Sequence, residues 1–341
     1  MAARALCGAI AAALVVGCDW LSLAEHALTY PTLQRGEVGN VVAFDSLFIA
    51  TAGEDGITVR GADGRVLATV LPPVGSESVD ALAIEGSLLL TLDACPPGHL
   101  TAWSMDDPMH PRLVTPPRDV AVGPFSGVSA AAGIVVVSGG TSRLTAWAYD
   151  SAGAIGVRFA TAELGRGQPD VLLARDGRVA FVSTHNWGPY FELDVVPMTP
   201  DSARMLHPSS RVALPGAGFT DGGAKPANFP VRAALLDDGT QLVAAGRGVA
   251  VMDVSDAEHA TIRRLIDMKG PVVSIATHGK RAAIVVAGEA PTLVVIDLTN
   301  ATQPLLRRHP LAPGTLPLGV AMSARTVAIA ARGQGVLVLH P

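Results

Sequence analysis

One unit is written twice between residues 248 and 311, and this duplication constrains the fold more than any other feature. The first copy contains the run Val249 to Asp253 and the pair Arg263-Arg264. The second contains Leu293 to Asp297 and Arg307-Arg308. The spacing between the aspartates that end the two runs is the same as the spacing between the two arginine pairs. A fixed period of roughly 20–50 residues is the signature of a repeat architecture, so the sequence predicts a repeat fold.

The repeating unit is predicted to consist of short β-strands. The chain of 341 residues is 49% hydrophobic and 16% charged and contains 36 Gly and 25 Pro, which favours short buried strands with tight turns over long amphipathic helices. Hairpin signals recur between the first and second strands of the units, at Glu85-Gly86, Asp176-Gly177, Asp238-Gly239 and His278-Gly279.

The apolar run recurs seven times as the third strand of a unit. These runs are Ile57 to Gly61, Leu100 to Trp103, Leu144 to Trp147, Phe191 to Val195, Val249 to Asp253, Leu293 to Asp297 and Val336 to Leu339. Seven units of about 46 residues, each with four antiparallel strands, predict an all-β, seven-bladed β-propeller over residues 26–341.

The two ends of the chain favour a closed ring. The last unit ends at its third strand, Gly335 to Leu339. We expect Ala27 to Leu33 to supply the missing fourth strand, because the spacing from Thr29 to Val41 equals that from Arg308 to Val320. The last blade would then be closed by an N-terminal strand. The alternative is a disordered N-terminal tail.

The N-terminal segment, positions 1–17, is predicted to be a lipoprotein signal peptide. Arg4 is followed by an apolar segment from Ala5 to Gly17, which is shorter than the ~20 residues that span a bilayer. The segment ends in Leu14-Val-Val-Gly-Cys18, which resembles a bacterial lipobox, so Cys18 is the predicted lipidation site and residues 18–25 a tether. The expected location is extracytoplasmic, with a lipid anchor in the membrane, in the periplasm or at the cell surface. The alternative is an ordinary signal peptide with an incidental cysteine.

The period fails in one place, which predicts a binding face. Gly177 and Gly239 are further apart than one period, and the excess lies in His185 to Tyr190 and Pro215 to Pro230. Both are connections that a propeller places on one face, and insertions on one face often mark a binding surface. An unknown protein or a glycan is the expected partner. The candidate contact residues on this face are Cys95, His99, His185, Trp187, Tyr190, Phe219, Asp221 and Lys225.

Other conspicuous polar residues are interpreted as structural. Asp and Asn at strand ends accept backbone hydrogen bonds in turns, so we interpret five of them as turn caps: Asp107, Asp253, Asp256, Asp297 and Asn300. The two arginine pairs suit a solvated outer strand. Cys95 and His99 could bind zinc, but one such pair is weak support for an ion that prefers four ligands, and a Pro-stiffened loop is favoured.

Charge and motifs argue against several function classes. The formal net charge is -5 without a basic block, so no nucleic acid partner is expected. The sequence has no nucleophile elbow, phosphate-binding loop or EF-hand pattern, and its nine histidines show no metal-ligand spacing. We therefore predict no catalytic residue, metal or cofactor, and a monomeric binding or scaffolding propeller. The alternative is an exported propeller hydrolase or lactonase with a divalent cation at the central channel, which convergence of three or more carboxylates or histidines there would favour.

The repeat resembles the LVIVD family. Leu293 to Asp297 matches the motif closely, Val249 to Asp253 matches it loosely, and Asp107-Pro108 matches the segment that follows it. The resemblance implies a propeller, commonly exported or surface-attached in bacteria, and brings no shared catalytic residues. The periodic signatures of WD40, Kelch and quinoprotein-type propellers are missing.

Overall fold

The computed structural model describes most of the chain from residue 40 onwards. The described residues are 40–44, 47–52, 56–70, 79, 81–93, 98–120, 127–139, 143–163, 170–185, 191–198, 205–206, 210–214, 233–239, 241–245, 248–256, 259–270, 272–300, 303–332 and 334–341. In these residues every regular element is a β-strand and none is a helix, as the composition predicts.

The described strands form seven sheets, which we number 1 to 7 in chain order. Sheet 1 contains β1 (Asn40–Phe44), β2 (Leu47–Ala52), β3 (Gly56–Arg60) and β4 (Val66–Val70). Sheet 2 contains β5 (Ala81–Glu85), β6 (Leu88–Asp93), β7 (His99–Ser104) and β8 (Arg112–Asp119). Sheet 3 contains β9 (Gly127–Ala131), β10 (Ile134–Gly139), β11 (Arg143–Tyr149), β12 (Ile155–Glu163) and β16 (Met205–Leu206). Sheet 4 contains β13 (Asp170–Leu173), β14 (Val179–His185), β15 (Phe191–Pro197) and β17 (Ser210–Leu214). Sheet 5 contains β18 (Ala233–Leu235), β19 (Gln241–Ala245), β20 (Val249–Asp253) and β21 (Thr261–Ile266). Sheet 6 contains β22 (Val272–His278), β23 (Arg281–Val286), β24 (Thr292–Asp297) and β25 (Leu305–Pro310). Sheet 7 contains β26 (Pro317–Met322), β27 (Val327–Ala331) and β28 (Gly335–Leu339).

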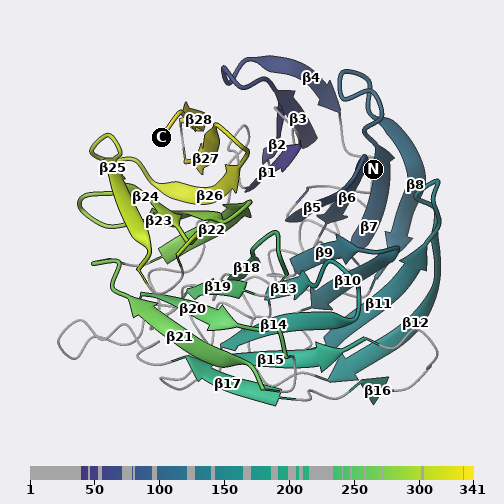
Figure 1. The fold of residues 1–341 in the computed structure, drawn as a ribbon. Coiled ribbons are helices and arrows are strands. Elements are labelled where there is room, and N and C mark those ends of the chain that lie inside the picture. Colours follow the sequence, from purple (N-terminus) through teal and green to yellow (C-terminus); the bar gives the residue numbers. More distant parts are fainter. Residues whose placement is uncertain are drawn as a thin grey trace, which may run out of the picture.

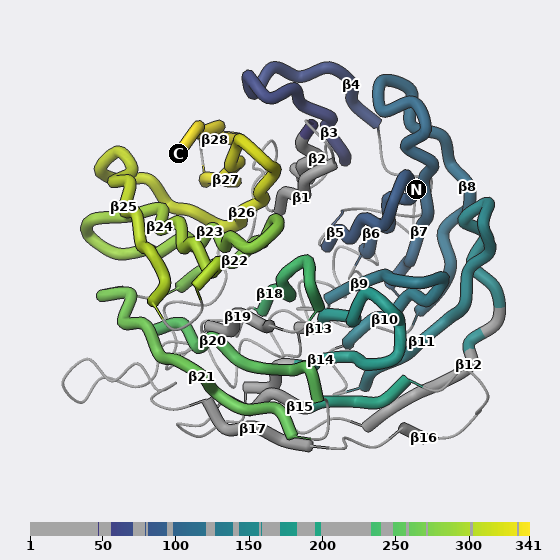
Figure 2. The backbone as a smooth tube through the Cα atoms, in the orientation of Figure 1, coloured from purple at the N-terminus to yellow at the C-terminus, as the bar shows by residue number. Residues whose placement is uncertain are grey.

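The sheets are arranged around a common centre, with the first strand of each innermost (Figure 1). Each innermost strand contacts the innermost strand of the next sheet, from β1 through β5, β9, β13, β18 and β22 to β26. β26 in turn contacts β1. The backbone trace follows the same circular path (Figure 2). This radial arrangement of antiparallel sheets is a β-propeller, the fold that the repeat predicts.

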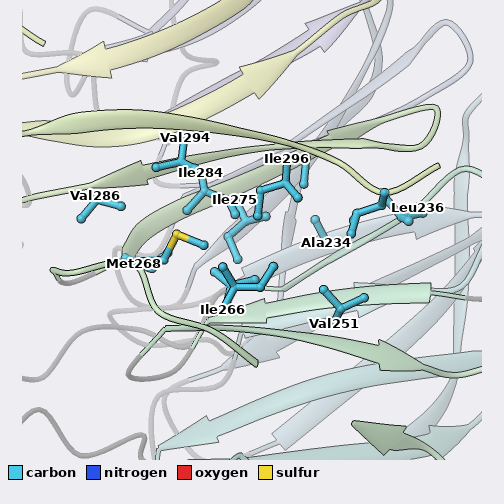
Figure 3. Packing of buried hydrophobic residues seen from close by; sticks show 14 residues of the cluster. Ala234, Leu236, Val251, Ile266, Met268, Ile275, Ile284, Val286, Val294 and Ile296 are labelled. Atoms are coloured by element: carbon cyan, nitrogen blue, oxygen red, sulfur yellow. The ribbon is translucent and has the colours of Figure 1, made fainter. Parts of the chain in front are cut away.

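The apolar runs are buried on both sides, which explains why they lack the alternation of a half-exposed strand. In β24, Val294 and Ile296 pack against sheet 5, whereas Leu293 and Val295 pack against sheet 7. All four are at most 6% exposed. Figure 3 shows the first of these two interfaces, with Ile266 of sheet 5 facing the side chains of sheet 6. Each fully buried aliphatic side chain stabilises the fold by about 1.5–3 kcal/mol.

Hydroxyl side chains on the innermost strands join neighbouring sheets. The Ser129 hydroxyl accepts a hydrogen bond from the Leu173 amide at 2.9 Å. The Thr277 hydroxyl donates to the Leu235 carbonyl at 2.7 Å. The Ser274 hydroxyl accepts from the Val320 amide at 3.1 Å. These bonds connect sheets 3 and 4, 5 and 6, and 6 and 7. They satisfy backbone groups that the sheet ladders leave open at the centre.

The structure differs from the predicted blade in sheet 3, which has a fifth strand. β16 pairs parallel with β12, Thr161 lying opposite Met205 and Ala162 opposite Leu206. The prediction of four antiparallel strands in every blade is therefore wrong here. β12 is nine residues long, and its outer edge would otherwise present unpaired backbone groups, which the short strand β16 covers in part.

Sheet 7 has three strands in the described residues. This agrees with the expectation that the last unit ends at its third strand. The segment predicted to complete the sheet, Ala27 to Leu33, lies outside the described residues. So do the predicted signal peptide, Cys18 and the tether.

Candidate binding face

The strand register defines two faces of the propeller. At one end of sheet 6, His278 lies opposite Arg281, Arg281 opposite Asp297, and Asp297 opposite Leu305. This end carries the turn between the first and second strands and the turn between the third and fourth, and we call it the turn face. The other end carries the connections from second to third strands and from each sheet to the next. We call it the loop face.

Three ionisable side chains meet at the loop face of sheet 2. Asp93 ends β6, His99 begins β7 and Asp119 ends β8, and the register places His99 opposite both aspartates. His99 Nδ1 lies 3.5 Å from Asp93 Oδ2, and His99 Nε2 lies 3.5 Å from Asp119 Oδ1. The imidazole is therefore held between two carboxylates.

Burial differs sharply across this cluster. The Asp93 side chain is 2% exposed and that of His99 16%, whereas the Asp119 side chain is 77% exposed. His99 Nδ1 is buried without a hydrogen-bond partner, and its separation of 3.5 Å from Asp93 Oδ2 is long for a hydrogen bond. The cluster thus runs from the interior to solvent and offers a carboxylate and an imidazole to a polar partner.

Sequence reasoning selected His99 but missed Asp93 and Asp119. The signal for Asp93 was available, because it ends the second strand of the unit and His99 begins the third. Asp119 was harder to find, since β8 is eight residues long and its pairing with β7 has irregular register. Asp119, the last residue of β8, comes to lie beside His99 only in the folded sheet.

The register also places the two insertions of the broken period. His185 ends β14 opposite Phe191, the first residue of β15, and Phe191 lies opposite Leu214, the last residue of β17. The strands that precede the two insertions, β14 and β17, therefore both end at the loop face. Of the other predicted contact residues, Cys95, Trp187, Tyr190, Phe219, Asp221 and Lys225 lie outside the described residues, and only the backbone of His185 is described.

The aspartates at the ends of the third strands make turn contacts on the turn face. Asp253 Oδ1 accepts from the Ser255 amide at 3.0 Å and from the Ser255 hydroxyl at 2.7 Å, while Oδ2 pairs with Arg263. These bonds, those from Ser255 first, lower the pKa of the Asp253 carboxyl to about 2. Asp297 Oδ1 accepts from the Thr299 amide at 2.9 Å, and hydrogen bonding to Thr299 lowers its pKa.

Two further aspartates pair with histidines three residues on. Asp107 Oδ2 lies 2.7 Å from His110 Nδ1, and this hydrogen bond lowers the pKa of Asp107. Asp256 Oδ2 lies 2.9 Å from His259 Nδ1. Asn300 occupies the matching turn in sheet 6, where its backbone carbonyl accepts from the Gln303 amide at 3.1 Å. The five residues interpreted as turn caps thus lie at the ends of third strands or in the turns that lead to the fourth strands.

The outer arginines do more than the sequence suggested. Arg263 pairs with Asp253 within its own sheet. Arg308 reaches the connection that follows β21, where its guanidinium donates to the Met268 carbonyl at 3.4 Å and to that of Asp267 at 3.3 Å. These side chains hold turns and neighbouring sheets together.

Neither a metal-binding cluster nor a membrane-spanning helix is found in the described part of the chain. No group of three or more His, Cys, Asp and Glu side chains there is arranged to hold a metal ion. Within the same residues, no helix has the length and apolar character needed to cross a membrane.

Comparison with known proteins relates the chain to others through its fold. No family model matches the sequence, and no curated protein matches it. Among solved structures, the mitotic checkpoint complex contains a similar chain, with a TM-score of 0.64, 13% identity and 93% of both chains covered. U3-55K has a TM-score of 0.60 and 14% identity over 93% of this chain and 100% of its own. The WD40 repeats of RRP9 have a TM-score of 0.58 and 14% identity over 90% of both chains.

At these identities the likeness shows the fold alone. The chain is an all-β propeller whose solved neighbours include WD40 propellers, although its sequence lacks the periodic WD40 signature.

Proposed function

We propose that this chain is a lipid-anchored, extracytoplasmic β-propeller that binds a protein or a glycan through its loop face and acts as a scaffold, without catalysis. It is a seven-bladed ring of the LVIVD type, closed by an N-terminal strand. The lipid is carried by Cys18, at the end of the apolar N-terminal segment.

The blade count is supported by the circle of contacts. All seven sheets contribute their first strand to this circle, and the contact between β26 and β1 joins the last sheet to the first. The sheets are also joined at the turn face. There the Gly279 amide donates to Asp237 Oδ2 at 2.8 Å, and Arg175 pairs with Asp237 at 2.5 Å. A closed ring is rigid, which suits the loops on its face to binding.

One observation carries the binding role: the strand register places the Asp93–His99–Asp119 cluster and the chain ends of both insertions on the same face. A surface made of loops on a rigid scaffold, with polar side chains held in place, is the usual form of a recognition site. Asp119 provides an exposed acceptor there, and His99 can donate or accept.

The proposal is tested by binding assays with immobilised protein, using a glycan array and cross-linked envelope extract as probes. Asp119→Ala removes an exposed carboxylate from the loop face. Asp107→Ala is the matched control, since it removes an exposed carboxylate from the turn face. We expect the first variant, and a variant with residues 215–230 shortened, to lose partner recovery while the control keeps it. Equal recovery by all variants would refute the loop face as the binding site.

A further inference from the structure

The turn face is divided into two arcs of opposite charge. Sheets 6, 7 and 1 are neighbours in the ring, and sheet 7 lies across the centre from sheets 3 and 4 (Figure 1). In the described turns and strand ends of this face, cations are in excess in sheets 6, 7 and 1, which we call the basic arc. Carboxylates are in excess in sheets 2 to 5, which we call the acidic arc. The basic arc has five cations, Arg60, Arg65, Lys280, Arg281 and Arg325, against Asp63 and Asp297. The acidic arc has nine carboxylates, Glu85, Asp106, Asp107, Asp150, Asp176, Asp237, Asp238, Asp253 and Asp256, against Arg112, Arg175 and Arg178.

Two cations of the basic arc are available to an external partner. Arg281 donates to the Ala324 carbonyl, which joins the first turn of sheet 6 to that of sheet 7. Lys280 and Arg325 are exposed in these two turns, and neither forms an ion pair with a residue that the structure describes. Two positive charges without an internal counter-ion therefore lie on adjacent turns.

Several carboxylates of the acidic arc are held in place by neutral groups of their own sheet. Asp106 Oδ2 accepts from the Ser104 hydroxyl at 2.7 Å, and hydrogen bonds from Ser87 and Ser104 lower its pKa. Asp150 Oδ1 accepts from two amides of its own turn at 2.9 Å. Three of the nine carboxylates lie within 4.0 Å of an arginine. Because neutral donors do not cancel charge, the arc keeps an excess of fixed negative charge at the surface.

The turn face also carries exposed apolar side chains. Val66 begins β4, Leu305 begins β25 and Met109 lies in the turn before β8, and they are 44%, 58% and 40% exposed. The first two belong to the basic arc and the third to the acidic arc. Interfaces between proteins combine apolar contacts with complementary charges. Both components are therefore present on each arc of the turn face.

We propose that two copies of this chain associate through their turn faces, with the basic arc of each against the acidic arc of the other. A half-turn about an axis in the plane of the interface, perpendicular to the line between the arcs, brings each arc over its opposite. This is an isologous contact, in which one surface is complementary to itself. An anionic membrane or polyanion would match the basic arc alone and would be repelled by the acidic arc, whereas a second copy matches both.

The dimer turns its two loop faces outwards, in opposite directions. This consequence rests on the binding role proposed above: a scaffold with two equivalent binding faces can link two partner molecules. The dimer differs from the monomer expected from the sequence, since the division of charge becomes apparent only when the turns are assigned to one face.

Sedimentation equilibrium tests the dimer with the purified full chain, in a nonionic detergent whose density is matched by the solvent. We expect the mass of a dimer at about 0.1 M salt and that of a monomer at about 1 M, because the screening length falls from about 10 Å to about 3 Å. A monomer at both salt concentrations would overturn the dimer. A dimer at both would overturn its electrostatic origin.

Charge reversal tests the pairing of the arcs. One variant carries Lys280→Glu and Arg325→Glu, and the other carries Asp106→Lys and Asp176→Lys, at exposed positions of the two arcs. We expect each variant alone to dimerise about tenfold or more weakly than the wild type, because both of its contacts bring like charges together. An equimolar mixture should dimerise again, since the reversed arcs attract each other and the two unchanged arcs still match. A mixture that stays monomeric would overturn the pairing of the arcs, even where each variant alone is monomeric.

The matched controls reverse exposed charges on the loop face. Lys269→Glu lies between β21 and β22, and Glu289→Lys lies between β23 and β24. Both should dimerise like the wild type, and weakening equal to that of the turn-face variants would show that overall charge governs association. The melting temperature of each variant shows whether it is folded. The partner assays on the loop face are independent of these measurements, so failure of the dimer and failure of the binding role are distinguishable.

Discussion

At the scale of single residues, Asp253 shows how a repeated charge stabilises a turn. Its carboxylate accepts from Ser255 and pairs with Arg263, which together lower its pKa to about 2. An unfolded aspartate titrates near 3.9. The folded state therefore favours the ionised form, and this stabilisation is fully present above about pH 5. It is lost as the pH falls through the two pKa values.

We expect Asp253→Asn to lower the free energy of unfolding by about 1 kcal/mol at pH 7, because Asn keeps a turn acceptor but loses the charge, and solvent screens part of the interaction. The difference from the wild type should shrink towards zero between pH 5 and pH 2. Urea unfolding at several pH values measures it, with Glu289→Gln, an exposed loop-face carboxyl, as control. A difference that stays constant with pH would contradict the role of the charge.

The hydroxyls of the innermost strands act between sheets, and Thr277 is the clearest case. Its hydroxyl donates to the Leu235 carbonyl of the neighbouring sheet at 2.7 Å. In Thr277→Val that carbonyl loses its donor while the shape of the side chain is kept. We expect a loss of about 1–2 kcal/mol in the free energy of unfolding. Thermal or urea denaturation measures it, with Thr261→Val, at an exposed position of β21, as control. Equal stability of the two variants would show that the bond contributes nothing.

At the scale of the element, a third strand is defined by burial on both sides. Such a run is visible in the sequence, and all seven predicted third strands overlap observed strands. The predicted hairpin glycines lie in turns with positive φ, as Gly177 (71°) and Gly279 (62°) show. The strand β16 could not be predicted, because two residues carry no periodicity. Its place beside β12 depends on an edge that exists only in the folded chain.

The interface between sheets should tolerate little change in volume. Leu236 is fully buried in the cluster between sheets 5 and 6, whereas Leu305 of β25 is 58% exposed. We expect Leu236→Ala to lower the free energy of unfolding by about 2–5 kcal/mol, since it leaves a cavity between the sheets. Leu305→Ala is the matched control and should change it by less than about 0.5 kcal/mol. Similar losses in both variants, measured by urea unfolding, would contradict the packing described for this interface.

At the scale of the whole molecule, the period predicted the ring but not the site. A ring needs only that each unit bury its two sides, a requirement repeated along the chain at a nearly constant spacing. The Asp93–His99–Asp119 cluster depends on three strand ends coming together in one sheet, and no repeat marks it. His99 could be selected from the sequence of its loop. Asp119 could not, because all of β7 and β8 separates the two residues along the chain. The irregular register between the consecutive strands β7 and β8 cannot be predicted from the sequence.

The two proposed roles of the whole molecule, anchoring and binding, depend on different parts of the chain, so mutations can separate them. In the proposed function, Cys18 carries the anchor and the loop face binds the partner. We expect Cys18→Ser to move the protein from the membrane fraction to the soluble fraction while its melting temperature and partner recovery stay unchanged, because the fold does not depend on the lipid. Cys95→Ser is the control and should remain with the membrane. Fractionation with immunodetection measures both proteins. Membrane association that survives Cys18→Ser would show that something other than this lipid holds the propeller at the bilayer.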